Sequence, residues 1–195
     1  MEAYARTPYR RRVVREKPIL FSNAMIRAVL AGTKTQTRRV VKGTALEWLR
    51  PDGFTPEFVA SEENRLCPYG HPGDQLWVRE TWRRYGDGIA YRADFHDKAF
   101  ADSVHAPWKP SIHMPRAAAR IQLEVTDVRV ERLQAISAED ARAEGHPRRE
   151  EITDEETHRD AAVDWYRDLW DSINGPGSWN ANPWVWVVEF RRLRP

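Results

Sequence analysis

The stretch Trp184-Val185-Trp186-Val187-Val188-Glu189-Phe190 decides the fold of this chain. Apolar side chains stand on both faces of this extended segment, which is typical of a strand that lies inside a sheet and is buried from both sides. Near the other end of the sequence, residues 18–21 predict a second short, buried strand. We expect both strands to belong to one sheet, because neither has a second sheet to pack on.

Further segments between these two ends have the composition of strands. Residues 75–82 carry the strongest signal, and residues 120–125 alternate before the pattern resumes at 128–130. Short strands along the whole chain, with helices between them, predict a compact sheet that is closed or nearly closed, since closure removes exposed edges. Weaker expected strands cover residues 34–41, 89–92 and 113–116.

Two short helices are expected from apolar positions three and four residues apart. The first follows Ser22, a good N-cap, and ends at Gly32, where a helix terminator is expected. The second follows Ser137, runs through Glu144 and is stopped by Gly145.

A longer helix is expected over residues 160–174, after the capping-box pair Thr153 and Glu156. Its apolar positions recur on one side, so the helix should pack that side against the sheet. The residues expected to be buried there are Trp165, Leu169, Trp170 and Ile173.

The overall composition is that of a folded globular chain. Its 195 residues suit one domain, and 41% hydrophobic residues are too many for a disordered chain. No apolar run reaches the roughly 18 residues that a membrane helix needs, so no membrane partner is expected. Residues 1–16 are rich in arginine and lack the apolar core of a secretory signal. We expect residues 1–16 to form a flexible basic tail and residues 17–195 to form a single domain.

The charge and the cysteine content of the chain limit the classes of function that it can have. Cys67 is the only cysteine, so an intrachain disulfide is excluded, which fits a reducing, cytoplasmic location. Neither Cys67 nor the six histidines show metal-ligand spacing, and no metal or other cofactor is expected. The net charge of +2 argues against duplex binding over the whole surface but leaves room for a local basic groove.

The densest group of polar side chains is Gly32-Thr33-Lys34-Thr35-Gln36-Thr37-Arg38-Arg39. Where the helix ends and the chain turns, backbone amides, hydroxyls and cations together suit a phosphate or a polarised carbonyl. A Thr beside a Lys is also a candidate nucleophile, with the amine taking its proton if the lysine pKa is lowered. The alternative is a solvated start of a strand, where Thr is favoured for its β-propensity alone.

A second polar group is Trp77-Val78-Arg79-Glu80-Thr81-Trp82, in which Trp77, Arg79 and Thr81 share one face of the expected strand. Arg and Trp together suit a stacked base with a phosphate nearby. The alternative is ordinary: Trp in the core and an Arg–Glu pair at its rim.

Glu144 stands at the carboxyl end of its helix, where a negative charge is unfavourable for the helix dipole. This placement hints at a role beyond helix stability. The alternative is that Arg142 or another cation offsets the charge.

Several of these stretches resemble a known family. Residues 30–39, Leu-Ala-Gly-Thr-Lys-Thr-Gln-Thr-Arg-Arg, resemble the signature of the ASCH-domain family. The similarity covers residues 18–193, and taken together its motifs are specific. The stretches that resemble the phage and prophage branch of that family are Cys67-Pro68-Tyr69-Gly70, Pro72-Gly73-Asp74, Leu76-Trp77-Val78-Arg79-Glu80, residues 109–116, residues 120–133 and Asn182-Pro183-Trp184-Val185-Trp186-Val187.

The resemblance implies an α+β fold of the PUA-like type, a small β-barrel with helices packed over its ends. It also implies a cleft suited to RNA, a nucleoside or a modified base. In one branch, the small bacterial N4-acetylcytidine amidohydrolases, the Lys-x-x-Thr-x-Arg pattern falls here on Lys34, Thr37 and Arg39, and the catalytic glutamate falls on Glu144. Compared with that branch this chain is longer, with insertions near 42–66 and 83–110.

Three functions are therefore expected, in decreasing order. The first is an amidohydrolase acting on an N4-acylated cytidine, with Thr37 as nucleophile, Lys34 as base and Glu144 holding the lysine or serving the leaving amine. The second is a non-catalytic module that binds RNA or a modified base in the same cleft. The third is a ribonuclease. The expected ligand-binding residues are Gly32, Thr35, Arg39, Trp77, Arg79 and Trp82, with amides near Gly32 stabilising an oxyanion.

Overall fold

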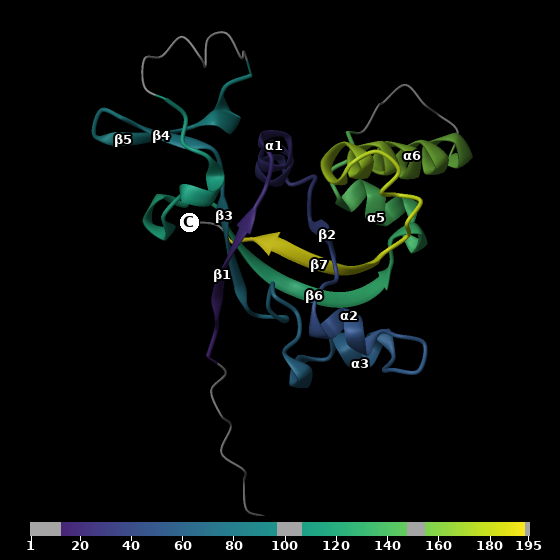
Figure 1. Cartoon of the computed structure of the whole chain (residues 1–195). Coiled ribbons are helices and arrows are strands. Elements are labelled where there is room, and N and C mark those ends of the chain that lie inside the picture. The colour runs from purple at the N-terminus through teal and green to yellow at the C-terminus, as the bar shows by residue number, and fades with distance from the viewer. Residues whose placement is uncertain (1–12, 97–106, 148–154, 194–195) are drawn as a thin grey trace, which may run out of the picture.

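The computed structural model describes residues 13–96, 107–147 and 155–193, and over 155–160 it describes the backbone alone. Within these residues the fold is α+β, with a five-stranded main sheet in the order β1-β3-β6-β7-β2 and a separate β4–β5 hairpin (Figure 1). The strands are β1 (Glu16–Leu20), β2 (Gln36–Val40), β3 (Gln75–Arg79), β4 (Trp82–Tyr85), β5 (Gly88–Tyr91), β6 (Gln122–Arg132) and β7 (Trp184–Arg192).

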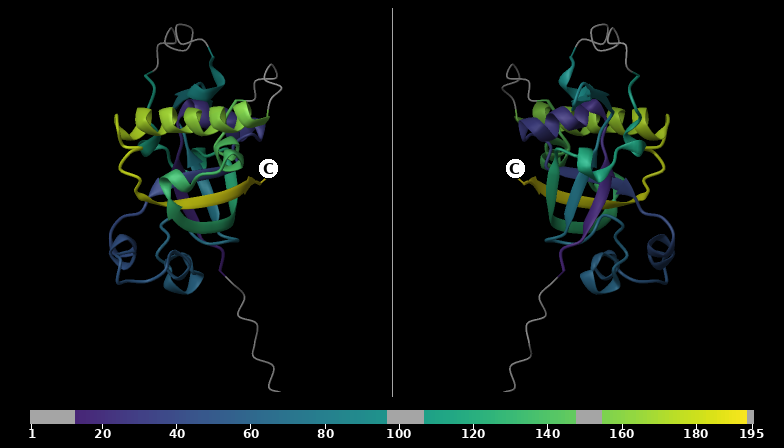
Figure 2. Two further views of the ribbon diagram at one scale, coloured as in Figure 1. Left: turned by 90° about the vertical axis from the view of Figure 1, so that its right-hand side faces the viewer. Right: turned by 90° about the vertical axis from the view of Figure 1, so that its left-hand side faces the viewer.

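Helices cover the main sheet from two sides. In the view of Figure 1, α1 (Asn23–Ala31), α5 (Ala138–Ala143) and α6 (Glu155–Asn174) lie above the sheet, and α2 (Thr44–Trp48) and α3 (Pro56–Ala60) lie below it. The turned views of Figure 2 show the same layers. Short 3-10 turns are η1 (Glu62–Asn64), η2 (Arg92–Asp94), η3 (Ser111–His113), η4 (Arg116–Ala118) and η5 (Leu133–Ala135).

Strand β7 is an interior strand, as its sequence predicts. It pairs antiparallel with β6 on one side and with β2 on the other. Trp186, Val188 and Phe190 face the main core, while Val185 and Val187 face a second core under α5 and α6. Two buried faces explain why this strand has no polar alternation.

Strand β1 belongs to the same sheet as β7, which confirms that the two ends of the sequence meet in one sheet. The closed barrel that the sequence favours is not seen: among the described residues the sheet is open, with β1 and β2 as its edges. A side chain spans these two edges, because Arg39 Nη2 donates a hydrogen bond to the Leu20 carbonyl at 2.7 Å. One such contact does not replace the ladder of backbone hydrogen bonds that closure requires.

The predicted helix ends are confirmed for α1 and α5. The Ser22 hydroxyl accepts a hydrogen bond from the amide of Met25, and Gly32 ends α1 with φ 77°. Ser137 and Asp140 form a reciprocal capping box at the start of α5. The capping residue Thr153, expected before α6, lies outside the described residues.

The burial predicted for α6 is confirmed at Trp170 and is wrong at Ile173. Trp170 is 5% exposed and packs in the second core with Tyr166 and Ala162, whereas Ile173 is 55% exposed. Trp165 and Leu169 are half-buried at the edge of that core. Ile173 lies in the last turn of α6, at the rim of a cavity described below, so the sheet does not cover it.

The sequence predicts a long surface excursion over residues 42–74, with few periodic apolar positions, but residues 42–66 are not irregular. They hold α2 and α3, each five residues long, and Val59 of α3 is fully buried in the main core. Pro56 at the start of α3 and the Thr55 hydroxyl as N-cap favour this helix. Helices this short contain too few turns to show an apolar period.

Two predicted strands also differ from the structure. The strand expected over 75–82 ends at Arg79, and Trp82 begins the β4–β5 hairpin. Between them Glu80 is fully buried and accepts hydrogen bonds from Arg120 at 2.9 Å. Residues 113–116 form parts of 3-10 turns instead of a strand.

Strand β1 begins one residue before the domain boundary expected at residue 17. Residues 1–12 lie outside the described part, but Arg15 is anchored through its amide, which donates to Asp74, and Glu16 begins β1. No helix in the described part of the chain is long and apolar enough to cross a bilayer.

Candidate functional site

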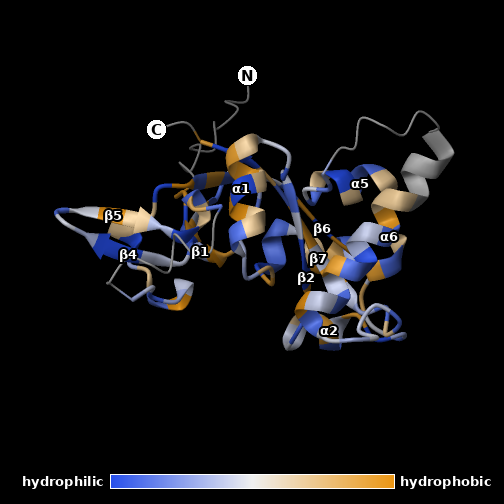
Figure 3. Ribbon diagram, turned by 90° about the horizontal axis from the view of Figure 1, so that it is seen from above, coloured by the Kyte–Doolittle hydropathy of each residue, from blue (hydrophilic) through white to orange (hydrophobic). Residues whose placement is uncertain are grey.

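The candidate site lies along β2. Figure 3 shows β2 between α1 on one side and the pair α5 and α6 on the other. Gly32 turns the chain out of α1, and the amides of Thr33 and Lys34 donate to the Ala28 carbonyl. These amides complete the helix end, so in this structure they are engaged and do not point to a ligand.

Lys34, two residues before the start of β2, forms a buried ion pair with Glu144. Lys34 Nζ lies 2.5 Å from Glu144 Oε2, and the two side chains are 0% and 2% exposed. Nζ also donates to the carbonyls of Gln36 at 2.8 Å and Glu144 at 3.1 Å. An ammonium group has three protons, and all three are used by these acceptors.

The surroundings of Lys34 lower its pKa. Burial lowers the pKa of Lys34; the Glu144 carboxylate opposes this effect, and the charges of Arg39 and Arg38 lower the pKa further. The amine therefore loses its proton more readily than a solvated lysine does.

Glu144 is held in place from two sides. It ends α5, and the Tyr166 hydroxyl of α6 donates to Glu144 Oε1 at 3.4 Å. The next residue, Gly145, has φ 102°, and an added Cβ would lie 3.1 Å from Ala28 Cβ and 3.4 Å from Lys34 Cβ. A glycine here lets the end of α5 approach α1 and the Lys34 stem closely.

A charged network supports β2 on the side of α5. Arg38 is 3% exposed, and its Nη2 lies 2.7 Å from Glu131 and 3.0 Å from Asp140. Gln36 donates to Asp140 at 2.8 Å and also accepts from Arg38 Nη1. Because Arg38 is fully compensated by carboxylates, it is a positioning residue for β2 and for Glu144, whose Oε1 lies 3.9 Å away.

The network makes stability depend on pH. Burial alone would raise the pKa of Asp140, but the hydrogen bond from Gln36 and the charges of Arg38 and Arg129 lower it from 3.8 to about 2. Because the pKa of Asp140 is lower in the folded state, its ionised carboxylate stabilises the fold above pH 3.8. This stabilisation is lost as the pH falls through about 2. We expect the unfolding free energy to drop by about 2 kcal/mol over that interval through this group.

Denaturant titrations of the wild type and Asp140→Asn at several pH values test this expectation. The variant should start less stable and converge on the wild type toward pH 2. A stability difference that stays constant with pH would contradict it.

Thr37 points to the face of β2 opposite to that of Arg38, because successive residues of a strand alternate between its two faces. In the sheet it pairs with Val188 of β7. It is 2% exposed, and within the described residues its hydroxyl forms no hydrogen bond, to Lys34 Nζ or to any other group. Thr37 and Glu144 line one cavity of about 60 Å³, the inner cavity. Its remaining lining residues are Met25, Arg38, Arg39, Val40, Tyr166, Leu169, Trp170, Ile173 and Asn174.

Trp170, one of the residues that line the inner cavity, has a buried donor without a partner. Trp170 is 5% exposed, and its indole Nε1 has no hydrogen-bond partner. A buried N–H without an acceptor is costly unless a ligand or water supplies one.

A larger hollow adjoins the inner cavity. This outer chamber has a volume of about 510 Å³ and shares Arg39, Val40 and Asn174 with the inner cavity. Its volume lies in the range of pockets that hold small molecules, about 300–1,000 Å³. The other residues that line it are Lys42, Gly43, Leu66, Pro68, Tyr69 and Trp186.

The remaining expected ligand-binding residues lie elsewhere. Gly32 and Thr35 are exposed at the turn before β2. Trp77 and Arg79 pack on each other, with the Arg79 guanidinium 4.6 Å from the Trp77 ring, on the face of β3 opposite to buried Val78.

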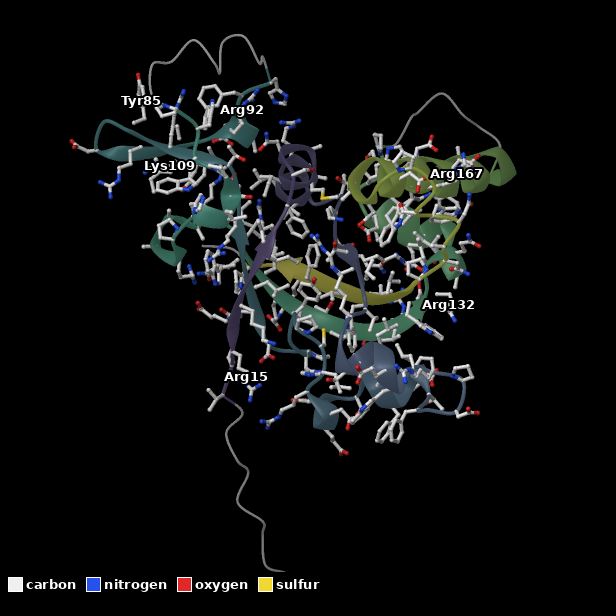
Figure 4. All side chains as sticks on the ribbon, in the orientation of Figure 1. Arg15, Tyr85, Arg92, Lys109, Arg132 and Arg167 are labelled. Carbon is white, nitrogen blue, oxygen red and sulfur yellow. The ribbon has the colours of Figure 1, made fainter. Side chains whose placement is uncertain are left out.

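Trp82 lies in a separate small cluster with Met114 and Ala118. The ammonium of Lys109 lies 5.1 Å from its ring, and Figure 4 places Lys109 beside the β4–β5 hairpin, on the side away from α5 and α6. Arg39 is therefore the one member of the expected ligand-binding set that lines the two hollows around β2.

Sequence reasoning assigned no site role to Tyr69, Tyr166 or Trp170. The last two belong to the apolar stripe of α6, where a hydroxyl and an indole N–H on a buried face are the signal that could have singled them out. Tyr69 lies inside a stretch quoted for the family resemblance, but its local pattern gives no reason to place it near Arg39.

The described residues contain no group of three or more His, Cys, Asp or Glu side chains placed to hold a metal ion. Cys67 is 2% exposed, and burial raises the pKa of its thiol to about 11. A thiol that stays protonated and covered is a core residue and not a nucleophile.

Comparisons with known proteins add no identification. No protein-family model, no curated protein and no solved structure matches this chain.

Proposed function

We propose that this chain is an ASCH-type amidohydrolase of the PUA-like class that removes the acyl group from an N4-acylated cytidine. The observation that carries the proposal is the Lys34–Glu144 pair, 2.5 Å apart and shielded from water, with Thr37 and Glu144 lining the same cavity. The desolvation cost of a buried ion pair can exceed its gain in stability, so the presence of this pair at a cavity that Thr37 also lines favours a chemical role.

The reaction follows from these three groups. The Lys34 amine, neutral once its ammonium has lost a proton to solvent and held in place by Glu144, takes the proton of the Thr37 hydroxyl as its oxygen attacks the acyl carbon. The resulting ammonium donates a proton to the leaving N4 amine, so the C–N bond breaks and the acyl group remains on Thr37 as an ester. Water, activated by the same amine, hydrolyses the ester and restores the resting side chains.

The cavity supplies what the transition state needs. The volume of about 60 Å³ has room for about two waters, which is also the size of a short acyl group. Trp170 lines this cavity, and its buried indole N–H has no partner. The proposal makes this N–H the donor to the developing oxyanion once the side chain turns it toward the cavity, the role that the sequence assigned to amides near Gly32.

The resting geometry requires one adjustment. Lys34 Nζ has its three donors on Glu144 and Gln36 and makes no hydrogen bond to Thr37. The proposal requires the Thr37 hydroxyl to reach the amine when a substrate occupies the cavity. Catalytic hydrogen bonds that are long or absent without substrate commonly form in the complex.

The pH dependence of turnover tests the base. Only the neutral Lys34 amine can accept the Thr37 proton, and burial lowers the pKa of this lysine below 10.5. We expect kcat/KM for N4-acetylcytidine to rise with pH and to level off below pH 10.5.

The conservative variant Glu144→Gln keeps the shape of the site but removes the carboxylate that holds the Lys34 amine in place, and we expect kcat to fall by about 100-fold. The assignment of the base is wrong if the wild-type rate is flat or falls between pH 6 and pH 10.

The second candidate function is a binding module without chemistry. It is favoured by one observation, that every proton of Lys34 is already engaged and none contacts Thr37. Under this alternative the ion pair only shapes the cleft, and cytidine or RNA binds without being changed.

A further inference from the structure

The outer chamber carries an unbalanced positive charge. Its nine lining residues include two cations, Arg39 and Lys42, and no carboxylate. Arg39 donates to the Leu20 carbonyl but pairs with no acidic side chain, and Lys42 is exposed and forms no ion pair within the described residues. By contrast, Arg38 is neutralised by Glu131 and Asp140.

Arg39 is fixed in place without being neutralised. Its guanidinium lies 5.6 Å from the Phe21 ring, and its Nε is buried without a hydrogen-bond partner. Two uncompensated cations on one concave surface repel each other, and an anion bound between them relieves that repulsion. The charge of the chamber therefore matches an anionic ligand.

The other walls suit a sugar and a ring. Tyr69 contributes aromatic surface, and Asn174 offers both a donor and an acceptor where the outer chamber joins the inner cavity. Burial raises the pKa of Tyr69, so at neutral pH it is an uncharged phenol that adds no negative charge to the chamber.

We propose that the outer chamber binds the ribose and phosphate of a cytidine nucleotide, so that the preferred substrate is phosphorylated. The inference rests on the proposed function, because an acyl group beside Thr37 directs the rest of the nucleotide past Arg39 into the outer chamber. Lys42 then pairs with the phosphate as a flexible point charge. The phosphate can belong to a mononucleotide or to an RNA strand, and the chemistry recognised is the same.

The test compares N4-acetylcytidine with its 5′-monophosphate. For the wild type at low ionic strength we expect kcat/KM to be about tenfold higher for the nucleotide, and we expect added salt to reduce this ratio. In Lys42→Gln the ratio should fall toward one. Arg84→Gln removes an exposed cation from the β4–β5 hairpin, outside the chamber, and should keep the wild-type ratio.

A ratio near one in the wild type, or a ratio that Lys42→Gln leaves unchanged, would overturn the inference while leaving the proposed hydrolysis intact. A short RNA that carries the same acylated base identifies the source of the phosphate. Turnover equal to or better than that of the mononucleotide supports a strand phosphate, and poorer turnover supports the free nucleotide.

If neither acetylated substrate is turned over, the proposed hydrolysis fails and the phosphate site is tested separately by calorimetry. Binding of cytidine 5′-monophosphate about tenfold tighter than cytidine, in the wild type and Arg84→Gln but not in Lys42→Gln, supports the site. Equal affinities in the wild type overturn it.

Discussion

Replacing Thr37 with Ala is expected to lower kcat for N4-acetylcytidine by about 1,000-fold or more, while leaving the affinity for the product cytidine nearly unchanged. The substitution removes the one oxygen that attacks the acyl carbon. It adds no bulk to the inner cavity and leaves the Lys34–Glu144 pair in place.

Thr37→Ser is the matched control, because it keeps the hydroxyl and removes one methyl group. It should retain measurable turnover, whereas Thr37→Ala should not. Wild-type turnover in Thr37→Ala would show that water attacks directly or that another residue is the nucleophile. Loss of cytidine binding in Thr37→Ala would instead indicate a misfolded site, which its thermal melting curve would reveal.

Replacing Trp170 with Ala is expected to reduce the unfolding free energy by roughly 3–5 kcal/mol. Trp170 is 5% exposed and fills the second core between α6, α5 and β7. Deleting its ring leaves a cavity that surrounding residues such as Tyr166 and Val187 cannot close, because they are held by a helix and an interior strand.

Ile173→Ala is the matched control for this prediction, since it comes from the same stripe of α6 but is 55% exposed. The loss of unfolding free energy in Ile173→Ala should be below about 1 kcal/mol. Denaturant unfolding of both variants gives the comparison. Equal losses would mean that the burial pattern of α6 in solution differs from the one described.

The parts of the fold that were predictable are those whose signal is local. The doubly apolar run in β7 and the caps of α1 and α5 each lie within about ten consecutive residues, and the structure confirms them. Helices α2 and α3 are too short to carry a period, and Glu80, the buried residue after the end of β3, pairs with Arg120, forty positions further along the chain. Such long-range pairs leave no local pattern.

Only part of the candidate site was predictable, because its side chains also come together from distant positions in the sequence. The turn at residues 32–39 is conspicuous in the sequence, but Lys34 and Glu144 are 110 positions apart, and no spacing rule joins them. The resemblance to the ASCH family supplied that pairing. The same resemblance gave no role to Trp170, whose unused N–H becomes visible only when α6 is packed against β2.

The most direct test of the central claim is incubation of the wild-type chain with N4-acetylcytidine, followed by chromatographic measurement of the products. The proposed function predicts release of cytidine and acetate in equal amounts, with many turnovers per chain. Unchanged N4-acetylcytidine, at concentrations where calorimetry shows that the chain binds it, would contradict hydrolysis and leave the binding module as the function of this cleft.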